Sequence, residues 1–546
     1  MFYNPRISAC RREDVSLKFN SFAFGLALTL SFIPFAYADD PAPGPGDTSI
    51  ALKYWVQFAK EGNAAAQYGL GYRYANGQGV EHDDAQAFEW YQKAAAQGNG
   101  QAEYALAYMY SNGRGIDKDQ REANAWYRKA AEQDNADAQY AIGYSYANGH
   151  GMDVDNEQAV SWYQKSAAHG QPQAQNALGY MYSHGLGVRE DDTIALGWYR
   201  KSADQGRSDA QYMLGYMYEN GLGTAADQSQ ALEWYQKSAD HGDAQGEYAL
   251  GYAYANGRGV DHDDAQAYSW YKKSAQQGRA DAQYALGNSF AGGLGVPRDD
   301  KQALQWYRKA ADQGRADAQY AVGYVYANGR GVPVNDDVAV EWYRKAADQE
   351  DALGEYALAF MYAGGRGLPK DFGKALEWYR KSADQGRSDA QHALGSMYEK
   401  GQGTSPDKAE AAAWYRKSAD QGNSEGQCSL GYLYYSGEGV PKDYSQAADL
   451  FRKAAEQGDA RGEYGLGYMY YNGYGVPKDR KQASDWFHRA ADQGLSEAQY
   501  GLTYMAANGD GPIKDIGPED EDPIKTNGQG EAPGWVILQL LTTLLP

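Results

Sequence analysis

The stretch AQYAIGYSYANG, residues 138–149, places three tyrosines within seven positions and ends at Asn148-Gly149. Close variants of the same words begin at residues 102, 210, 246 and 318. Alanine favours a helix, and a glycine after the last turn supplies the left-handed conformation that ends one. The stretch therefore predicts a helix that recurs along the chain, and it raises the question of what so many phenol rings do.

The recurrence has a fixed period. A Gly-x-Gly pair follows each tyrosine-rich stretch, first at Gly77 and next at Gly113, and each later pair begins a further 36 residues along the chain. A Trp-Tyr pair, first Trp90-Tyr91, keeps the same spacing and degenerates only near the end. Twelve full units run over 64–495 with a partial unit at each end, so the predicted repeat region spans 48–511.

Each unit predicts two helices. Helix A is the tyrosine-rich stretch and ends at Asn-Gly. After a short turn, an aspartate or asparagine such as Asp83 recurs at the same spacing and is suited to cap the first N–H groups of helix B. Helix B carries the Trp-Tyr pair. One such helix pair cannot bury its own apolar face, whereas a stack of pairs can, so the sequence predicts an all-α repeat fold.

The words ADAQYAVGYVYANGRGV, 316–332, and VAVEWYRKAADQ, 338–349, resemble the Sel1-like repeat family, a relative of the tetratricopeptide repeats. The match rests on residue types and spacings that agree in a dozen copies. The resemblance implies a right-handed α/α superhelical solenoid of 36-residue helix-turn-helix repeats. It also implies that variable positions of helix A line an inner, concave surface.

Helix geometry divides the tyrosines into two populations. At about 100° per residue, Ala66, Leu70 and Tyr74 fall on one face of the first helix A, whereas Tyr68 and Tyr72 fall on the opposite side. The Tyr74 series therefore belongs to the predicted core. Gly71 lies beside that face, where a missing side chain would let the neighbouring helix approach closely.

The Tyr68 and Tyr72 series form i,i+4 pairs that this core does not need. If they line the inner surface, the protein presents a ladder of phenols that could bind a ligand. The predicted ligand-binding residues are Tyr104, Tyr108, Tyr140, Tyr144, Tyr212, Tyr216, Tyr248, Tyr252, Tyr320 and Tyr324. The alternative is that the rings are structural filler between stacked repeats. Interruptions of the ladder at Asn176, Asn288, His392 and Cys428 favour local specificity over filler.

The charge and the motifs exclude several function classes. The formal net charge of −21 gives no electrostatic route to nucleic acid. Gly-x-Gly before an aspartate superficially resembles a calcium repeat, but that repeat needs a period of nine residues. The pattern lacks the Gly-Lys-Ser/Thr of a phosphate loop. The histidines are scattered, so we expect no metal and no cofactor.

The sequence also gives no indication of a disulfide or of a reactive cysteine. Cys10 precedes the predicted mature chain, which leaves Cys428 as one cysteine without a disulfide partner. No basic cluster near it in the sequence would lower its pKa, so we expect an inert thiol. Some cysteine-rich members of the family bind penicillins, but the chain lacks their paired cysteines. We find no nucleophile–base pair outside the repeat and expect a protein that is not an enzyme.

The first residues of the chain do not follow the repeat pattern. Arg6, Arg11, Arg12 and Lys18 precede the apolar run SFAFGLALTLSFIPFAYA, which ends in Ala36-Tyr37-Ala38. This pattern predicts a signal peptide over 1–38, cleaved after Ala38, and a linker over 39–47. An uncleaved membrane anchor is the alternative. The expected location of the mature chain is periplasmic or secreted.

The other end also changes character. Residues 512–534 are acidic and rich in proline and glycine, which predicts a linker. Residues 535–546, WVILQLLTTLLP, are apolar but too few to span a bilayer. This tail could pack on the last repeat, bind a partner or contact a membrane surface, and its lack of charge disfavours the membrane.

Growth by block duplication supports a scaffold, because KSADQGRSDAQ at 201 returns at 381. We therefore expect an exported scaffold or adaptor that binds an extended protein partner on its tyrosine-lined concave face, as relatives do in envelope signalling, secretion and host interaction. The alternative is a solenoid that binds carbohydrate, since aromatic ladders also stack on sugar rings.

Overall fold

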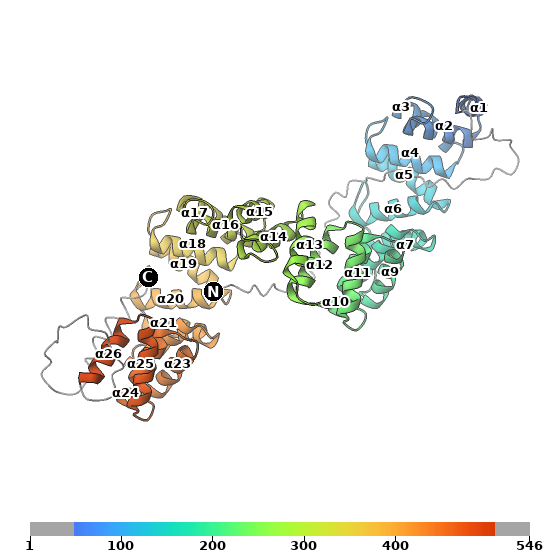
Figure 1. Cartoon of the computed structure of the whole chain (residues 1–546). Helices are drawn as coiled ribbons and strands as arrows, with labels where there is room; N and C mark the ends of the chain where they lie inside the picture. The colour runs from blue at the N-terminus through green and yellow to red at the C-terminus, as the bar shows by residue number, and fades with distance from the viewer. Residues whose placement is uncertain (1–47, 508–546) are drawn as a thin grey trace. The chain divides into compact units, whose positions relative to one another are not determined.

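A computed structural model of the chain describes residues 48–507, which form 26 α-helices and contain no strand. The predicted all-α repeat fold is confirmed. The helices group into two compact units, α1–α6 and α7–α26, with the division between Asp155 and Asn156. Within each unit, consecutive helices lie side by side in chain order (Figure 1). The predicted signal peptide, both predicted linkers and the apolar tail lie outside the described residues.

The even-numbered helices are the predicted A helices, and the odd-numbered ones are the B helices. The first unit contains α1 (Thr48–Lys60), α2 (Ala64–Asn76), α3 (Asp84–Ala95), α4 (Gly100–Asn112), α5 (Gln120–Glu132) and α6 (Ala136–Asn148). The second contains α7 (Asn156–Ala168), α8 (Pro172–His184), α9 (Asp192–Asp204), α10 (Ser208–Asn220), α11 (Gln228–Asp240), α12 (Ala244–Asn256), α13 (Asp264–Gln276), α14 (Ala280–Gly292), α15 (Asp300–Asp312), α16 (Ala316–Asn328), α17 (Asp336–Ala347), α18 (Ala352–Gly364), α19 (Phe372–Asp384), α20 (Ser388–Lys400), α21 (Lys408–Asp420), α22 (Ser424–Ser436), α23 (Tyr444–Glu456), α24 (Ala460–Asn472), α25 (Arg480–Asp492) and α26 (Ser496–Ala507).

The predicted helix ends are confirmed. Gly77, which follows α2, has φ of 65° and lies in the left-handed region, and its N–H donates to the carbonyl of Arg73. At the start of α3, the Asp83 carboxylate accepts from the N–H of Gln86 at 3.0 Å. Both devices recur along the array. They fix where each helix stops and starts, so the turn between A and B keeps one length.

The A and B helices of a repeat meet through a tyrosine ring that lies on a glycine. A Cβ built on Gly215 of α10 would lie 2.6 Å from Cδ1 of Tyr235 in α11, closer than packed atoms allow. Tyr235 is only 4% exposed. The predicted close approach at the Gly71 position is therefore confirmed, and the atom that uses the space belongs to the Trp-Tyr pair. Equivalent contacts join Gly71 with Tyr91, Gly179 with Tyr199, Gly251 with Tyr271, Gly287 with Tyr307, Gly323 with Tyr343 and Gly395 with Tyr415.

From Gly115 to Gly475, the second glycine of each Gly-x-Gly pair makes a contact between repeats. Gly259 has φ of 68°, and a Cβ on it would lie 2.6 Å from the carbonyl oxygen of Gln228, the first residue of α11 in the preceding repeat. A side chain is excluded both by conformation and by space. Because one loop must meet one helix start in every repeat, an insertion or deletion would break the contact, which accounts for the unvarying period.

The residue between the two glycines also reaches the preceding repeat, with a different chemistry at different steps. Arg114 donates to Asp84 at 2.7 Å, and Arg366 donates to Asp336 at 2.6 Å. Near the end of the array, the Tyr474 ring instead stacks on Tyr444 with centroids 4.6 Å apart. The position therefore joins adjacent repeats by an ion pair at some steps and by aromatic stacking at another.

The tryptophan of the Trp-Tyr pair packs between successive repeats. Trp126 of α5 packs against the cluster that contains Ala94 and Ala95 of α3. The Lys129 ammonium lies 3.6 Å from the centroid of the same ring and covers its outer side. This lysine–tryptophan pair recurs in every B helix from α3 to α21.

A buried glutamine near the start of most A helices forms hydrogen bonds with the B helix of the preceding repeat and with the end of the B helix of its own repeat. The Gln391 amide donates to the carbonyl of Ala383 in the preceding repeat at 3.1 Å and accepts from Gln421 of its own B helix at 2.7 Å. Because the end of the B helix thus meets the start of the A helix, the pair is antiparallel. Four repeats carry glutamate here instead: Glu103, Glu247, Glu355 and Glu463. An ionised carboxylate cannot donate to the carbonyl.

None of the helices over 48–507 is both long and apolar enough to cross a bilayer.

The glycine contact yields a first prediction. Gly215→Ala forces a methyl group against the Tyr235 ring and should destabilise the array by about 1–3 kcal/mol, measured by urea unfolding followed by circular dichroism. Gly197→Ala in the adjacent α9 is the matched control, because nothing lies within 4 Å of its Cβ position. The control should be neutral or stabilising by helix propensity. Equal effects of both substitutions would contradict the packing role of Gly215.

The buried glutamates yield a second prediction. Burial raises the pKa of Glu355 from 4.5 to about 7. Because the folded-state pKa lies above the unfolded one, the stability contribution is full below pH 4.5 and is lost as the pH rises through 7. Glu355→Gln should therefore stabilise the protein at pH 8 by about 1–3 kcal/mol relative to the unsubstituted chain and have little effect at pH 4.5.

The reciprocal control for this pair is Gln319→Glu in α16, where the glutamine donates to Ala311 at 3.2 Å. Urea midpoints between pH 4.5 and pH 8 should show an added loss of stability at high pH in this variant. A pH dependence that neither substitution alters would contradict the assignment of the buried carboxylates.

Candidate binding face

The predicted ligand-binding tyrosines lie on five A helices and form two rows. The first row contains Tyr104 on α4, Tyr140 on α6, Tyr212 on α10, Tyr248 on α12 and Tyr320 on α16. The second row contains Tyr108, Tyr144, Tyr216, Tyr252 and Tyr324, four residues further along the same helices. We call the surface that both rows form on α10–α16 the tyrosine face. Tyr104 to Tyr144 belong to the first unit of the chain.

The first row takes part in the core, which the helix geometry did not predict. The Tyr320 ring lies 5.7 Å from the ring of buried Tyr343, centroid to centroid, and Tyr248 lies 5.7 Å from Tyr271. Tyr212 makes the same contact with Tyr235. The interpretation that the core does not need this row is therefore wrong. Tyr235, Tyr271 and Tyr343 thus each have a glycine on one side and a first-row ring nearby.

The second row is more open in the second unit. Tyr324 is 36% exposed, and Tyr216 and Tyr252 are half-buried. In the first unit, by contrast, Tyr104 and Tyr108 are both buried, so the expectation that they face outward is wrong there. Tyr140 and Tyr144 are half-buried and contact each other with centroids 6.3 Å apart. Among the ten predicted tyrosines, Tyr324 of the tyrosine face is therefore the most accessible.

The series assigned to the core from sequence lies between the A and B helices. Tyr218, Tyr362, Tyr398 and Tyr434 are buried, as predicted, and the other described members are half-buried. The Tyr434 hydroxyl accepts from the Arg416 guanidinium at 2.6 Å. The rings pack inside while the hydroxyl groups reach a basic residue at the edge of the B helix.

Arginines flank the first row, and the sequence analysis missed them. Arg279 precedes α14 at the capping position, where it makes no side-chain cap. Its guanidinium carbon lies 4.9 Å from the Tyr248 ring centroid, and a guanidinium nitrogen lies 2.6 Å from Asp281. Arg315 and Arg387 lie over Tyr284 and Tyr356 in the same way. The sequence did contain a signal for these arginines. At these N-cap positions arginine replaces asparagine or aspartate, which loses the stabilising hydrogen bond of a capping side chain.

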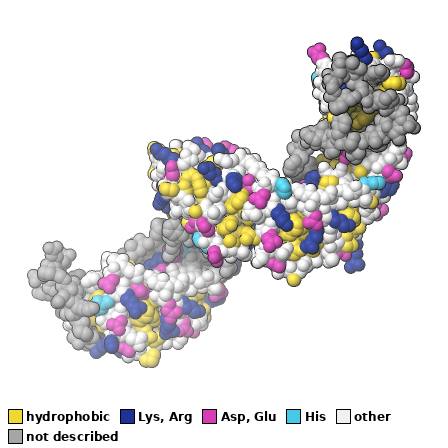
Figure 2. All heavy atoms as spheres, turned by 45° about the vertical axis from the view of Figure 1, so that its right-hand side comes forward, with side chains coloured by type: hydrophobic (Ala, Val, Ile, Leu, Met, Phe, Trp, Pro, Cys, Tyr) yellow, Lys and Arg dark blue, Asp and Glu magenta, His cyan; other side chains and the backbone are white. Residues whose placement is uncertain are grey.

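The surface carries both signs of charge. On the face drawn in Figure 2, basic and acidic side chains lie interspersed with hydrophobic ones. Burial raises the pKa of Tyr320 and of Tyr356 to about 12. These phenols therefore stay neutral in the physiological range and remain hydrogen-bond donors. The tyrosine face thus combines neutral phenols with arginine–aspartate pairs.

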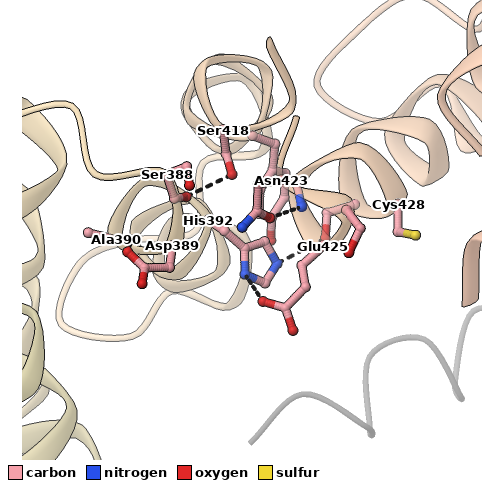
Figure 3. A network of polar contacts seen from close by, with 12 residues as sticks. Ser388, Asp389, Ala390, His392, Ser418, Asn423, Glu425 and Cys428 are labelled. Carbon is pink, nitrogen blue, oxygen red and sulfur yellow. Dashed lines mark hydrogen bonds and ion pairs between the residues drawn. The ribbon is translucent and has the colours of Figure 1, made fainter. Parts of the chain in front are cut away.

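The residues that interrupt the tyrosine rows make polar contacts with neighbouring helices. In Figure 3 the His392 imidazole points toward Glu425, with Nδ1 at 3.4 Å from the carboxylate, and Nε2 lies 3.2 Å from the Ser429 hydroxyl. The hydrogen bond from His392 lowers the pKa of Glu425. Elsewhere Asn176 donates to Asp209 at 3.2 Å, and Asn288 accepts from Tyr307 at 2.8 Å. Each interruption thus exchanges a phenol for a polar contact to a neighbouring helix.

Cys428 lies at the next interruption. Its thiol is buried and donates to Asp459 at 3.5 Å. Burial raises the pKa of this thiol well above its usual range, which disfavours the reactive thiolate. Within residues 48–507, no group of three or more histidine, cysteine, aspartate or glutamate side chains is placed to hold a metal ion.

Comparison with known proteins gives a family and a number of similar solved structures. The family model described as Sel1 repeat matches residues 64–99, 100–135, 136–171, 172–206, 208–243, 244–278, 280–314, 316–351, 352–386, 388–423, 424–459, 460–495 and 496–517. The chain is 35% identical to a protective antigen of uropathogenic Escherichia coli strains that displays an SLR fold. The match covers 88% of this chain and 99% of that chain, with a TM-score of 0.70.

A Sel1 repeat protein from Oxalobacter formigenes is also 35% identical over 58% of this chain and 95% of that chain, with a TM-score of 0.46. No curated protein matches the chain.

The unequal packing of the two rows yields a third prediction. Tyr320→Ala removes the ring that lies near buried Tyr343 and should destabilise the array by about 2 kcal/mol, since half-buried aromatic side chains contribute less than fully buried ones. Tyr324→Ala, one turn later on α16, should change stability by less than about 1 kcal/mol. Thermal melts of both variants check this. A larger loss for Tyr324→Ala would contradict the assignment of the rows.

Proposed function

The chain belongs to the Sel1 repeat family, and on that premise we propose that it is a non-catalytic scaffold that binds an extended segment of a partner protein along the tyrosine face. The observation that carries the proposal is the second row. Tyr216, Tyr252 and Tyr324 recur at the same position of α10, α12 and α16, where Tyr324 is 36% exposed and the other two are half-buried. Sel1 repeats generally mediate interactions between proteins.

The chemistry of the face suits a protein ligand. A phenol offers a large, rigid contact area and one hydrogen bond, and tyrosine is among the residues that contribute most at protein interfaces. Arg279 and Asp281 form a fixed pair beside the rings, so a bound segment meets donors and acceptors at defined steps. The net charge of −21 disfavours nucleic acid as the partner.

We place this activity in the periplasm or outside the cell. The support is the predicted signal peptide over 1–38 and the E. coli relative, which is described as a protective antigen. The same support makes a role in envelope signalling, secretion or host interaction the preferred setting. The polar groups at the ladder interruptions already bond to neighbouring helices, which agrees with a binding role and not a catalytic one.

The fourth prediction tests the face. A mature chain starting at residue 39 serves as bait for proteins of envelope and host extracts, and the dissociation constant of the partner it retains is then measured by calorimetry. The triple variant Tyr216→Ala, Tyr252→Ala and Tyr324→Ala should bind that partner at least about tenfold more weakly, because each contact residue contributes on the order of 1 kcal/mol or more.

The matched control removes exposed apolar side chains that lie outside α10–α16: Val154→Ala, Ile194→Ala and Val334→Ala, which are 60%, 42% and 58% exposed. The control should bind as the unsubstituted chain does. Equal binding by both triple variants would contradict the proposal. Retention of glycans in a parallel array, lost in the tyrosine variant, would favour carbohydrate as the ligand instead.

A further inference from the structure

A hollow lies between α22, α23 and α24, at the point where the first row is interrupted by cysteine. Its lining includes Cys428 and Tyr432 of α22, Phe451 of α23, and Arg461, Tyr464 and Tyr468 of α24. With its open mouth the hollow measures about 380 Å³, and about 20 Å³ of it is free for the centre of a water molecule. This inner space, which we call the enclosed end, has room for one water molecule or one hydroxyl group.

Three departures from the repeat meet at the hollow. Cys428 stands where most A helices carry a first-row tyrosine, which removes a phenol ring. Phe451 replaces the tyrosine of the Trp-Tyr pair and removes a hydroxyl. Gly465 stands where alanine is usual, and the Phe451 ring takes the space of the absent methyl group, since a Cβ there would lie 2.6 Å from the ring. The cysteine therefore leaves this repeat without the ring that most others place on the B-helix aromatic residue.

The missing ring is visible in the stacking pattern. In the preceding repeat His392 lies 5.4 Å from Tyr415, centroid to centroid, and in the following repeat Tyr464 lies 5.5 Å from Phe487. The same register at Phe451 holds the cysteine thiol instead of a ring. Phe451 also sits less tightly on its own glycine, since a Cβ on Gly431 would lie 3.1 Å from the ring, against 2.6 Å for Gly215 and Tyr235.

The hollow also holds an unsatisfied polar group. Tyr432 is only 6% exposed, unlike the open phenols of the second row, and its buried hydroxyl has no hydrogen-bond partner. A buried hydroxyl without a partner destabilises the folded chain, so a group that supplies one gains that energy on binding. At the mouth, the hydroxyl of Tyr435 donates to that of Tyr468 at 3.3 Å, which keeps an aromatic wall in place. Arg461 on the same helix pairs with Glu425 at 3.4 Å.

We propose that this hollow is a pocket for a phenolic side chain of the bound partner, which supplies the ring that Cys428 lacks. The partner ring covers Phe451 in the register of the first row, and its hydroxyl occupies the enclosed end, where it accepts a hydrogen bond from Tyr432. The inference rests on the proposed function, because it names one anchor residue of the extended segment. It concerns α22–α24, whereas the second-row triple variant tests α10–α16.

The fifth prediction uses p-cresol, the side-chain analogue of tyrosine, with the full mature chain. Nuclear magnetic resonance titration should show binding with a dissociation constant on the order of 1 mM, as expected for a ligand of this size. Cys428→Tyr restores the repeat's own ring, fills the hollow and should weaken p-cresol at least tenfold. Cys428→Ala, which keeps the hollow open, should bind p-cresol as the unsubstituted chain does.

Tyr432→Phe separates the hydrogen bond from the fit of the ring. It should weaken p-cresol several-fold and leave toluene unchanged. Melting curves establish that each variant is folded, and Cys428→Tyr should melt at the same or a higher temperature. Absence of p-cresol binding, or equal binding by Cys428→Tyr, would overturn the pocket. If the second-row variant nevertheless loses the partner, the proposed function stands without this anchor.

Discussion

The structure depends on a contact that most repeats share, between a tyrosine of the B helix and a glycine of the A helix before it. Tyr235 lies so close to Gly215 that a methyl group on the glycine would collide with the ring. This contact sets how near the two helices of a repeat approach, and the buried ring then offers its remaining surface to the first row. Two A helices carry alanine at the glycine position, Ala107 and Ala359, and both alanines are fully buried.

The contacts between repeats restrict the sequence at the positions that make them. From Gly115 on, the second glycine of each loop meets the first turn of the preceding B helix, Trp126 packs against a cluster that includes residues of the preceding B helix, and a buried glutamine reaches the preceding carbonyl. These contacts leave few free choices of residue or spacing. The A-helix positions that face away from them can change, and there the chain places arginine caps, polar interruptions and one cysteine. A surface that varies on a constant framework is what a specific binding protein requires.

Much of the fold could be predicted from the sequence because each element repeats a dozen times. The spacing gave the helix pairs, Asp83 and Gly77 gave their ends, and Gly71 gave the close approach. The role of the first row could not be predicted from one helix considered alone. A tyrosine side chain is long enough to reach past its own helix, so the angle of Tyr320 says little until the position of Tyr343 is known. The same limit hid the hollow, since Cys428, Phe451 and Gly465 lie apart in sequence and matter only together.

The central claim is that the open second row, and not the tryptophan–lysine surface of the B helices, contacts the partner. Tyrosine nitration followed by mass spectrometry, with and without the captured partner, tests it most directly. The account predicts that Tyr216, Tyr252 and Tyr324 are nitrated in the free protein and protected in the complex. Nitration of these three residues that the partner leaves unchanged, with protection of B-helix residues instead, would contradict it.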